Sequence, residues 1–111
     1  MIKRYIPNAG DVVWLHFDRP DATGQEKKTA VVLSPSTYNK KTGLMVCCPI
    51  TAQIKGYPFE VLIGTADNAA ALSDQVKSIN WANSKISHRG RVSSVELAQI
   101  RAKLHALVFK G

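Results

Sequence analysis

The chain has 111 residues, of which 45% are apolar and 21% charged, a composition that excludes a disordered chain and predicts one packed domain over residues 1–111. Fifteen Lys and Arg against eight Asp and Glu leave a formal charge of +7, which predicts a positive face and a polyanionic partner. The apolar runs are too short to span a bilayer and the N-terminus does not read as a signal peptide, so we expect a cytoplasmic protein with no membrane partner.

The first half of the chain contains three predicted strands. Asp11–Phe17 alternates β-branched and aromatic residues between two faces, and Ala30–Leu33 and Leu44–Pro49 are short apolar runs. Between the first two, Asp18–Lys27 is polar and contains Pro and Gly, which predicts a long flexible loop. Turn-forming residues at Asn39–Gly43 separate the second and third strands.

The second half adds two predicted strands and one helix. The strands are Phe59–Ile63 and Gln75–Ile79, divided by the Gly- and Ala-bearing segment Gly64–Ala71. Ser93 and Glu96 fit a capping box, and apolar residues then recur at helical spacing at Leu97, Ile100, Leu104 and Leu107. The pattern predicts a mainly β fold: a small, strongly curved antiparallel sheet or partly open barrel with a C-terminal helix.

The residues do not favour metal, thiol or serine chemistry. The eight acids are scattered along the chain, so no carboxylate cluster is expected to hold a cation. Cys47 and Cys48 are adjacent on a predicted strand, so their side chains point to opposite faces, and we expect both to be small core residues. No nucleophile-elbow pattern is present.

RNA needs less from a protein, because it carries its own nucleophile in the 2′-hydroxyl. A protein that aligns this group needs a proton acceptor, a proton donor and charge stabilisation. Candidate cations are Lys27, Lys28, Lys55 and a basic cluster at 85–91, which we expect to be a loop; for each lysine, solvated surface charge is the alternative. His16 and His88 are open as an acid and base pair, although ordinary packing and solvation of the two rings is the favoured interpretation.

Four segments in order resemble the MazF/PemK family of toxin endoribonucleases over nearly the whole chain. They are Tyr5–Trp14 with its Tyr-Ile-Pro and Gly-Asp pairs, Ala30–Pro35, Lys55–Val61 and Asp74–Ile79. The resemblance implies an SH3-like, MazF/CcdB-like barrel and a homodimer. It also implies sequence-specific cleavage of single-stranded RNA without metal or other cofactor, leaving 2′,3′-cyclic phosphate and 5′-hydroxyl ends. An acidic antitoxin is implied as the protein partner, bound in the same positive groove as RNA.

The resemblance also assigns the catalytic positions. The family's hydroxyl residue after the third strand corresponds to Thr51, and its basic residue before the second strand corresponds to Lys28. The family has Arg followed by Pro at the latter position, whereas here Lys28 is followed by Thr29. Arg is a planar clamp that stays protonated, and Lys is a point charge that its neighbours can make a proton acceptor. We expect Lys28 to be the acid/base residue, with a phosphate-holding role as the alternative.

Four further residues are expected to bind RNA. Phe17 would stack on a base, Gln53 would read a base edge, and Lys55 and Lys27 would contact phosphate, with the loop before Lys28 ordering over the substrate. The alternatives are a core position for Phe17, a turn position for Gln53 and surface charge for the lysines.

Two other functions remain open. Toxins of the same fold can act without catalysis by binding a protein such as DNA gyrase, and an RNA-binding module can bind without cleaving. Thr51 and a basic residue at Lys28 favour the nuclease, since a gyrase-binding protein does not need them. The sequence does not specify the RNA bases that are read, the cellular target RNAs or the identity of the antitoxin.

Overall fold

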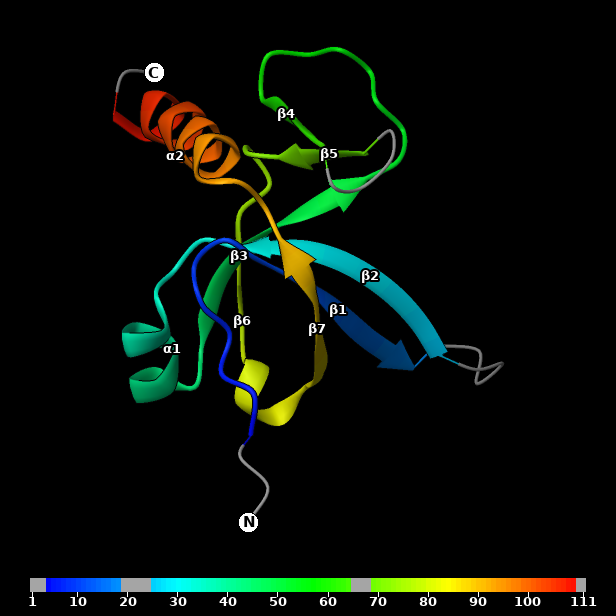
Figure 1. The fold of residues 1–111 in the computed structure, drawn as a ribbon, viewed down its shortest axis with the longest axis vertical. Coiled ribbons are helices and arrows are strands. Elements are labelled where there is room, and N and C mark those ends of the chain that lie inside the picture. Colours follow the sequence, from blue (N-terminus) through cyan, green and yellow to red (C-terminus); the bar gives the residue numbers. More distant parts are fainter. Residues whose placement is uncertain (1–3, 19–24, 65–68, 110–111) are drawn as a thin grey trace.

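The computed structural model describes residues 4–18, 25–64 and 69–109, with backbone alone for residues 17, 18, 25 and 26. The elements in chain order (Figure 1) are β1 (Asp11–Asp18), β2 (Gln25–Val32), α1 (Ser36–Thr42), β3 (Met45–Thr51), β4 (Glu60–Ile63), β5 (Ala69–Leu72), β6 (Lys77–Ile79), the 3₁₀ turn η1 (Trp81–Asn83), β7 (Lys85–Arg91) and α2 (Ser94–Phe109). The strands form one seven-stranded antiparallel sheet in the order β4-β5-β3-β2-β1-β7, with β6 on β3. The predicted mainly β fold with a C-terminal helix is confirmed.

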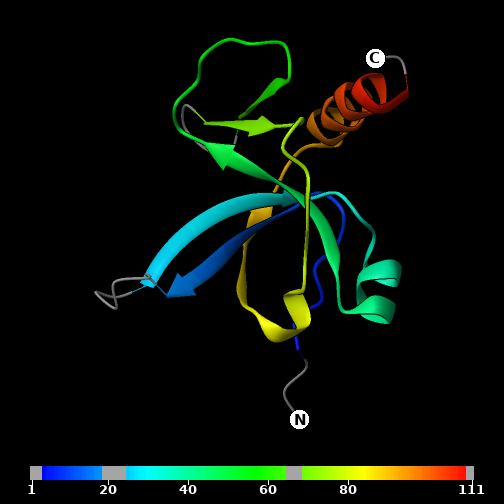
Figure 2. The ribbon, with the colours of Figure 1, turned by 180° about the vertical axis from the view of Figure 1, so that it is seen from behind.

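Strand β3 divides the molecule into two parts. Its residues 47–49 pair with β2 and residues 45–47 pair with β6, whereas Ile50 and Thr51 have left β2 and pair with β5. The sheet therefore bends within β3. On one side of the bend, β1, β2, β6 and β7 curl around a small barrel, and on the other lie the β4–β5 hairpin and α2 (Figures 1 and 2).

The central strands are buried on both faces. One apolar cluster lies inside the barrel and includes Val32, Cys47 and Trp81, and a second lies under α2 and includes Val31 and Cys48. This double burial explains why these strands appear in the sequence as continuous apolar runs. Cys47 and Cys48 are free, buried and on opposite faces, as predicted.

Helix α2 begins at the predicted capping box. The Ser93 hydroxyl accepts a hydrogen bond from the Glu96 backbone N–H at 3.0 Å, and the Glu96 carboxylate accepts one from the Ser93 N–H at 2.8 Å. Ile100 is fully buried, and Leu97 and Leu104 pack against the same cluster. Leu107, the last of the four apolar residues at helical spacing, is 42% exposed. Among the described residues, no helix is long and apolar enough to cross a membrane.

The second strand begins earlier than predicted. It starts at Gln25 rather than Ala30, since Asp18 pairs with Gln25 and the ladder with β1 continues to Val31. The predicted loop Asp18–Lys27 is therefore wrong at both ends, and residues 19–24 lie outside the described part. Polar residues are compatible with this strand because its first half pairs with β1 alone and extends beyond β3 as a two-stranded arm (Figure 1).

Besides the 3₁₀ turn η1, three elements escaped prediction because none shows the local pattern typical of its kind. Helix α1 is a polar turn of helix that ends at Gly43, whose φ of 75° favours glycine. Strand β5 is mostly Ala, a weak strand former. Strand β7 contains the basic cluster at 85–91, which we expected to be a loop, and is held extended by pairing with β1.

Candidate active site and RNA-binding groove

The predicted catalytic residues lie on one face of the sheet. The last residue pair between β2 and β3 is Ala30 opposite Pro49. Lys28 lies two residues before Ala30, within β2 rather than before it, and Thr51 lies two residues after Pro49. Because side chains alternate along a strand, Lys28 and Thr51 project from the same face as this pair.

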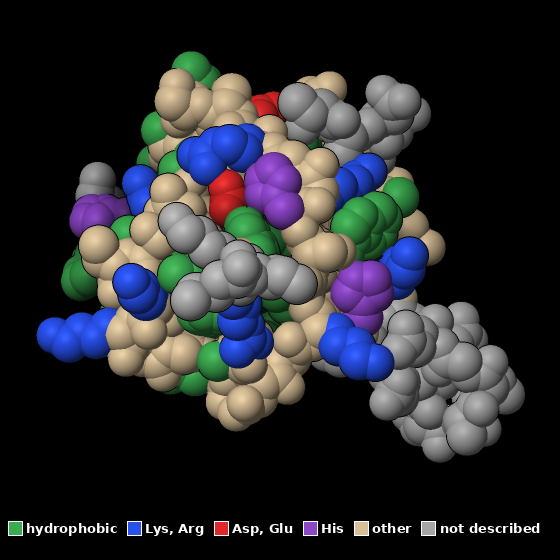
Figure 3. Space-filling model, turned by 60° about the horizontal axis from the view of Figure 1, so that its bottom comes forward, with side chains coloured by type: hydrophobic (Ala, Val, Ile, Leu, Met, Phe, Trp, Pro, Cys, Tyr) green, Lys and Arg blue, Asp and Glu red, His purple; other side chains and the backbone are tan. Residues whose placement is uncertain are grey.

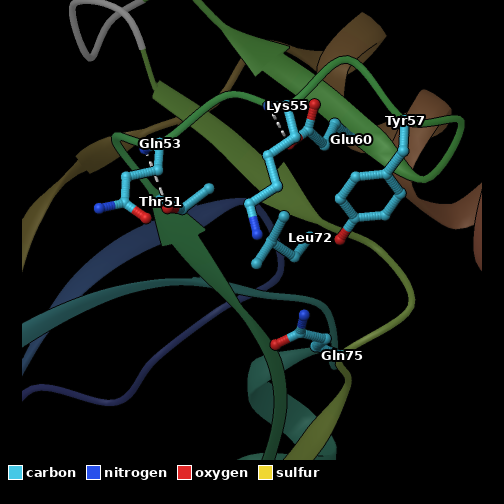
Figure 4. A pocket seen from close by; sticks show the side chains of 7 residues that line it. All are labelled: Thr51, Gln53, Lys55, Tyr57, Glu60, Leu72 and Gln75. Carbon is cyan, nitrogen blue, oxygen red and sulfur yellow. Dashed lines mark hydrogen bonds between the residues drawn. The ribbon is translucent and has the colours of Figure 1, made fainter.

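Thr51 lines a polar pocket where β3 meets the β4–β5 hairpin. The pocket has a volume of about 110 Å³, and its lining (Figure 4) comprises Thr51, Gln53, Lys55, Tyr57, Glu60, Leu72 and Gln75. The Lys55 side chain extends into the space between Thr51 and Tyr57. Two hydroxyls, an ammonium, two amides and the Glu60 carboxylate thus line one small space, whose donors suit a phosphate with an adjoining base edge.

A carboxylate shapes the loop that carries Lys55. The two oxygens of Glu60 accept hydrogen bonds from the backbone N–H groups of Lys55 at 3.0 Å and Gly56 at 2.7 Å. Gly56 has a φ of 79°, a conformation that other residues rarely adopt. On the far side, the Tyr57 hydroxyl donates to Asp74 at 3.2 Å. Desolvation, with the Asp74 charge as the next cause, raises the pKa of Tyr57, so this hydroxyl stays protonated at neutral pH.

Lys28 lines a second, more apolar pocket at the open end of the barrel. This pocket measures about 240 Å³, and its floor is formed by Leu15, Ala30, Cys47 and Pro49. Lys28 and Lys77 stand on its rim, Lys77 coming from β6, where it pairs with Cys47. An apolar floor with cations on its rim suits a nucleotide whose base lies on the floor and whose phosphate lies at the rim.

The two pockets adjoin along two segments of the chain. Thr51 in the first follows Pro49 in the second on the same face of β3, and Gln75 in the first precedes Lys77 in the second. We call the two together the cationic groove. It carries the ammonium groups of Lys28, Lys55 and Lys77, drawn from three separate parts of the fold.

The structure brings only some of the predicted site residues together. Gln53 and Lys55 lie in the cationic groove with Thr51. Lys27 does not, because it pairs with His16 while Lys28 pairs with Leu15, and the two lysines therefore project from opposite faces of β2. Phe17 lies in β1 opposite Glu26, and its side chain is outside the described part.

The two histidines do not form an acid and base pair, in agreement with the favoured interpretation of ordinary packing and solvation. His88 pairs with Val13 and His16 with Lys85, so the two rings lie on opposite faces of the sheet. The ring of His16 is 3.2 Å from the Ser87 hydroxyl, and the ring of His88 packs edge-on against Tyr5. Within the described residues, no group of three or more His, Cys, Asp or Glu could hold a metal ion.

The sequence reasoning missed Lys77, Gln75 and Tyr57. All three belong to segments already matched to the family, but nothing in their local pattern separates them from surface residues. Lys77 shares one face of β6 with Ile79, and only the pairing of β6 with β3 shows that this face lines the second pocket.

Thr51 is arranged to donate a hydrogen bond. Its Oγ accepts a hydrogen bond from the backbone N–H of Gln53 at 3.0 Å (Figure 4), which fixes the oxygen and leaves the hydroxyl proton available for an acceptor in the groove. A pentavalent phosphorane supplies such an acceptor, and nearby ammonium groups balance its charge. The groove is therefore equipped for phosphoryl transfer within a single-stranded nucleic acid.

Comparison with known proteins gives the class of the chain. Residues 8–108 match the family described as "PemK-like, MazF-like toxin of type II toxin-antitoxin system". The endoribonuclease toxin MazF of Escherichia coli (strain K12) is 46% identical over 110 residues, covering 97% of this chain and 99% of the relative. The crystal structure of MazE-MazF (Form-II) from Deinococcus radiodurans matches with a TM-score of 0.87 and 35% identity over 97% of this chain and 100% of that one. An endoribonuclease from Mycobacterial species, in complex with its cognate antitoxin, has a TM-score of 0.71 at 19% identity over 90% of this chain and 92% of that one, and shows the fold alone.

The chain therefore belongs to the PemK-like, MazF-like family of type II toxins. The resemblance seen in the four sequence segments is confirmed, and so is the MazF-like fold that it implied.

Proposed function

We propose that this protein is the endoribonuclease toxin of a toxin–antitoxin pair and cleaves single-stranded RNA at a short sequence without a metal ion. The observation that carries the proposal is the cationic groove: the Thr51 hydroxyl shares one of its pockets with the Lys55 ammonium group, and Lys28 and Lys77 line the other pocket. The 46% identity to an endoribonuclease toxin supports the same activity. The whole 1–111 chain acts as one toxin domain.

The reaction uses the substrate's own ribose. The 2′-hydroxyl attacks the adjacent phosphorus, the bond to the 5′-oxygen breaks, and the products are a 2′,3′-cyclic phosphate and a 5′-hydroxyl. Lys28 acts as the acid/base residue: it accepts the proton of the attacking 2′-hydroxyl or donates one to the leaving 5′-oxygen. Thr51 donates a hydrogen bond to a phosphorane oxygen, and Lys55 and Lys77 neutralise phosphate charge. Gln53 and Gln75 present amides that can read base edges.

The first experiment incubates the purified protein with a long unstructured RNA in EDTA and sequences the cut ends. Cuts at a recurring short sequence with cyclic phosphate ends are expected. Cleavage that appears only when Mg²⁺ is added, or equal cleavage of the deoxyribose strand, would refute the proposed chemistry. Binding without any cleavage would assign the chain to the non-catalytic alternatives.

Substitutions then test the two catalytic roles. Thr51→Val keeps the shape of the side chain but removes its donor, and a loss of kcat of about 10²–10³-fold is expected. Lys28→Ala is expected to lose about 10²–10⁴-fold. Lys28→Arg separates the two roles of this residue. If Lys28 is the acid/base residue, the variant should cleave more slowly and its pH profile should shift. If Lys28 only holds phosphate, the variant should keep its cleavage activity. Lys41→Ala, an exposed lysine of α1, is the matched control and should keep full activity.

The partners follow from the same groove. An acidic antitoxin is proposed to compete with RNA for it, in line with solved relatives described as MazE-MazF. We also propose a homodimer in the cytoplasm. The exposed apolar side chains Leu62 on β4 and Val108 and Phe109 at the end of α2 support self-association, which light scattering across protein concentrations measures.

A further inference from the structure

The sheet surface opposite the cationic groove carries a second positive patch. It is formed by side chains at alternate positions of β1, β2 and β7, and we call it the outer face: Trp14, His16, Lys27, Lys85, Ser87 and Arg89. Figure 3 looks onto a face of the molecule where Lys, Arg and His side chains gather beside exposed apolar ones and acidic colour is sparse. Nothing in the proposed cleavage reaction uses these residues.

An aromatic ring lies at the centre of the outer face. The Arg89 guanidinium lies 4.8 Å from the centre of the half-buried Trp14 ring, and the Lys27 ammonium lies 5.8 Å from it. Arg89 comes from β7 and Lys27 from β2, the strands on either side of β1. At 5.8 Å, Lys27 is at the limit of a cation–π contact. Its ammonium group can therefore contact a phosphate instead, and a base can stack on the Trp14 ring.

Among the described side chains, no carboxylate neutralises the cations of this patch. Within the described part of the chain, Lys27, Lys85 and Arg89 make no ion pair with a carboxylate, and the acidic residue Asp11 is engaged by Arg91 instead. Two cations against an aromatic ring, with Lys85 on the same face, are a combination that holds single-stranded nucleic acid, because the ring stacks on a base of any identity and the cations hold the backbone. An acidic peptide would use the cations but would not need the ring.

The outer face is continuous with the cationic groove over the margin of the sheet. In the described residues, pairing of β2 with β3 ends at Ala30, so Lys27 and Lys28 lie where β2 has β1 on one side only. Lys28 projects toward the groove and Lys27 toward the outer face. A strand that leaves the groove at Lys28 therefore needs only to cross the margin of β2 to reach Lys27 and Trp14.

We propose that the outer face is an RNA exosite: it holds the part of a single-stranded substrate that extends beyond the cationic groove, Trp14 by stacking and Lys27, Lys85 and Arg89 through phosphates. This inference rests on the proposed endoribonuclease function. It predicts that the length of the RNA, and not only the cleaved sequence, determines affinity.

The test compares a short RNA of about 6 nucleotides centred on the mapped cut sequence with the same RNA extended to about 18 nucleotides. Both carry a 2′-O-methyl group at the cut position, and their affinities are measured by fluorescence anisotropy at several salt concentrations. The variants are Lys85→Gln/Arg89→Gln and, as a control that removes equal charge from α1, Lys40→Gln/Lys41→Gln. Trp14→Leu and Trp14→Phe separate stacking from charge.

The extended RNA is expected to bind the wild type at least tenfold more tightly than the short one. Lys85→Gln/Arg89→Gln should lose about five- to tenfold affinity for the extended RNA, with a salt slope shallower by roughly 1.4, while cleavage of an unmodified short RNA is unchanged. Trp14→Leu should lose roughly tenfold and Trp14→Phe should retain affinity. The control should match the wild type on both RNAs.

Several results would overturn the exosite. Equal affinity of the wild type for short and extended RNA would do so while leaving the proposed function intact, provided the short RNA is cleaved. Equal losses in the control pair would show a general charge effect. Binding of polyglutamate and the oligomeric state are measured for the same variants. If the variants lose affinity only for polyglutamate, the outer face binds an acidic protein instead. If they change only the oligomeric state, it binds a second copy of the chain. A wild type that cuts no RNA would overturn both proposals.

Discussion

Asn39 holds three segments of the chain together from a fully buried position, and replacing it by Ala tests how far the barrel depends on it. Its side-chain amide donates to the carbonyls of Pro7 at 2.8 Å and Ser34 at 3.0 Å, and its oxygen accepts from the Ser34 hydroxyl at 2.6 Å. Its backbone carbonyl accepts from the Trp81 ring N–H at 2.9 Å. The N-terminal segment, α1 and η1 therefore all meet at this residue.

The magnitude follows from the three side-chain hydrogen bonds. At about 1 kcal/mol each, and with two buried carbonyls and a hydroxyl left without this partner, Asn39→Ala should lower the free energy of unfolding by about 3–4 kcal/mol. That is a large part of the roughly 5–15 kcal/mol typical of a domain, and it corresponds to a Tm lower by roughly 10–20 °C. Asn39→Asp should cost at least as much at neutral pH, because it places a carboxylate against two carbonyl oxygens.

Urea unfolding followed by tryptophan fluorescence measures the effect, since Trp81 is bonded directly to this residue. The control is Asn83→Ala, an exposed asparagine of η1 that should change stability by less than about 0.5 kcal/mol. A loss below about 1 kcal/mol for Asn39→Ala would refute the reasoning, because it would mean that the three buried bonds are replaced without cost.

Three further predictions concern other parts of the molecule. Hydrogen bonds, first of all from the Gly64 backbone N–H, hold the pKa of Glu96 below its ordinary 4.5, so its contribution is complete above about pH 4.5 and is lost as the pH falls through the lower folded-state value. Urea titrations of wild type and Glu96→Gln should therefore converge in stability as the pH falls below about 4.5. Burial raises the pKa of Cys47 to about 11 and of Cys48 to about 12, so a thiol reagent at neutral pH should label neither in the native protein and both in denaturant; rapid native labelling would contradict their burial. Lys77→Gln should weaken RNA binding and make the slope of log affinity against log salt concentration shallower by about 0.7. An unchanged slope would show that Lys77 does not contact an RNA phosphate.

The elements with a strong local pattern were predictable from the sequence. The alternation in β1, the apolar runs of β2 and β3, and the capping box of α2 depend on residues close together in the chain, whose side-chain periodicity reports the face that each one buries. Elements held by their neighbours were not predictable in this way. Strand β7 is basic and polar, and it is extended only because β1 supplies its hydrogen bonds.

Some residues of the candidate site could likewise be predicted from the sequence, and others could not. Thr51 and Lys28 could be identified from ordered motifs in the sequence, and both lie on the face of the cationic groove. Lys77 could not, because its role depends on β6 lying beside β3, a contact between residues about thirty positions apart. Lys27 and Lys28 are adjacent in sequence but project to opposite faces.

The positive charge, the β class of the fold, the C-terminal helix and the family could be predicted, since they depend on composition and on local or ordered motifs. The cations that share a surface could not be predicted, because their grouping depends on how the strands pair. The tertiary structure assigned Lys28, Lys55 and Lys77 to one groove and Lys27, Lys85 and Arg89 to the opposite face. The physical reason is that strand pairing fixes the face of every side chain, and the partners of a strand are chosen by long-range packing rather than by its own residues.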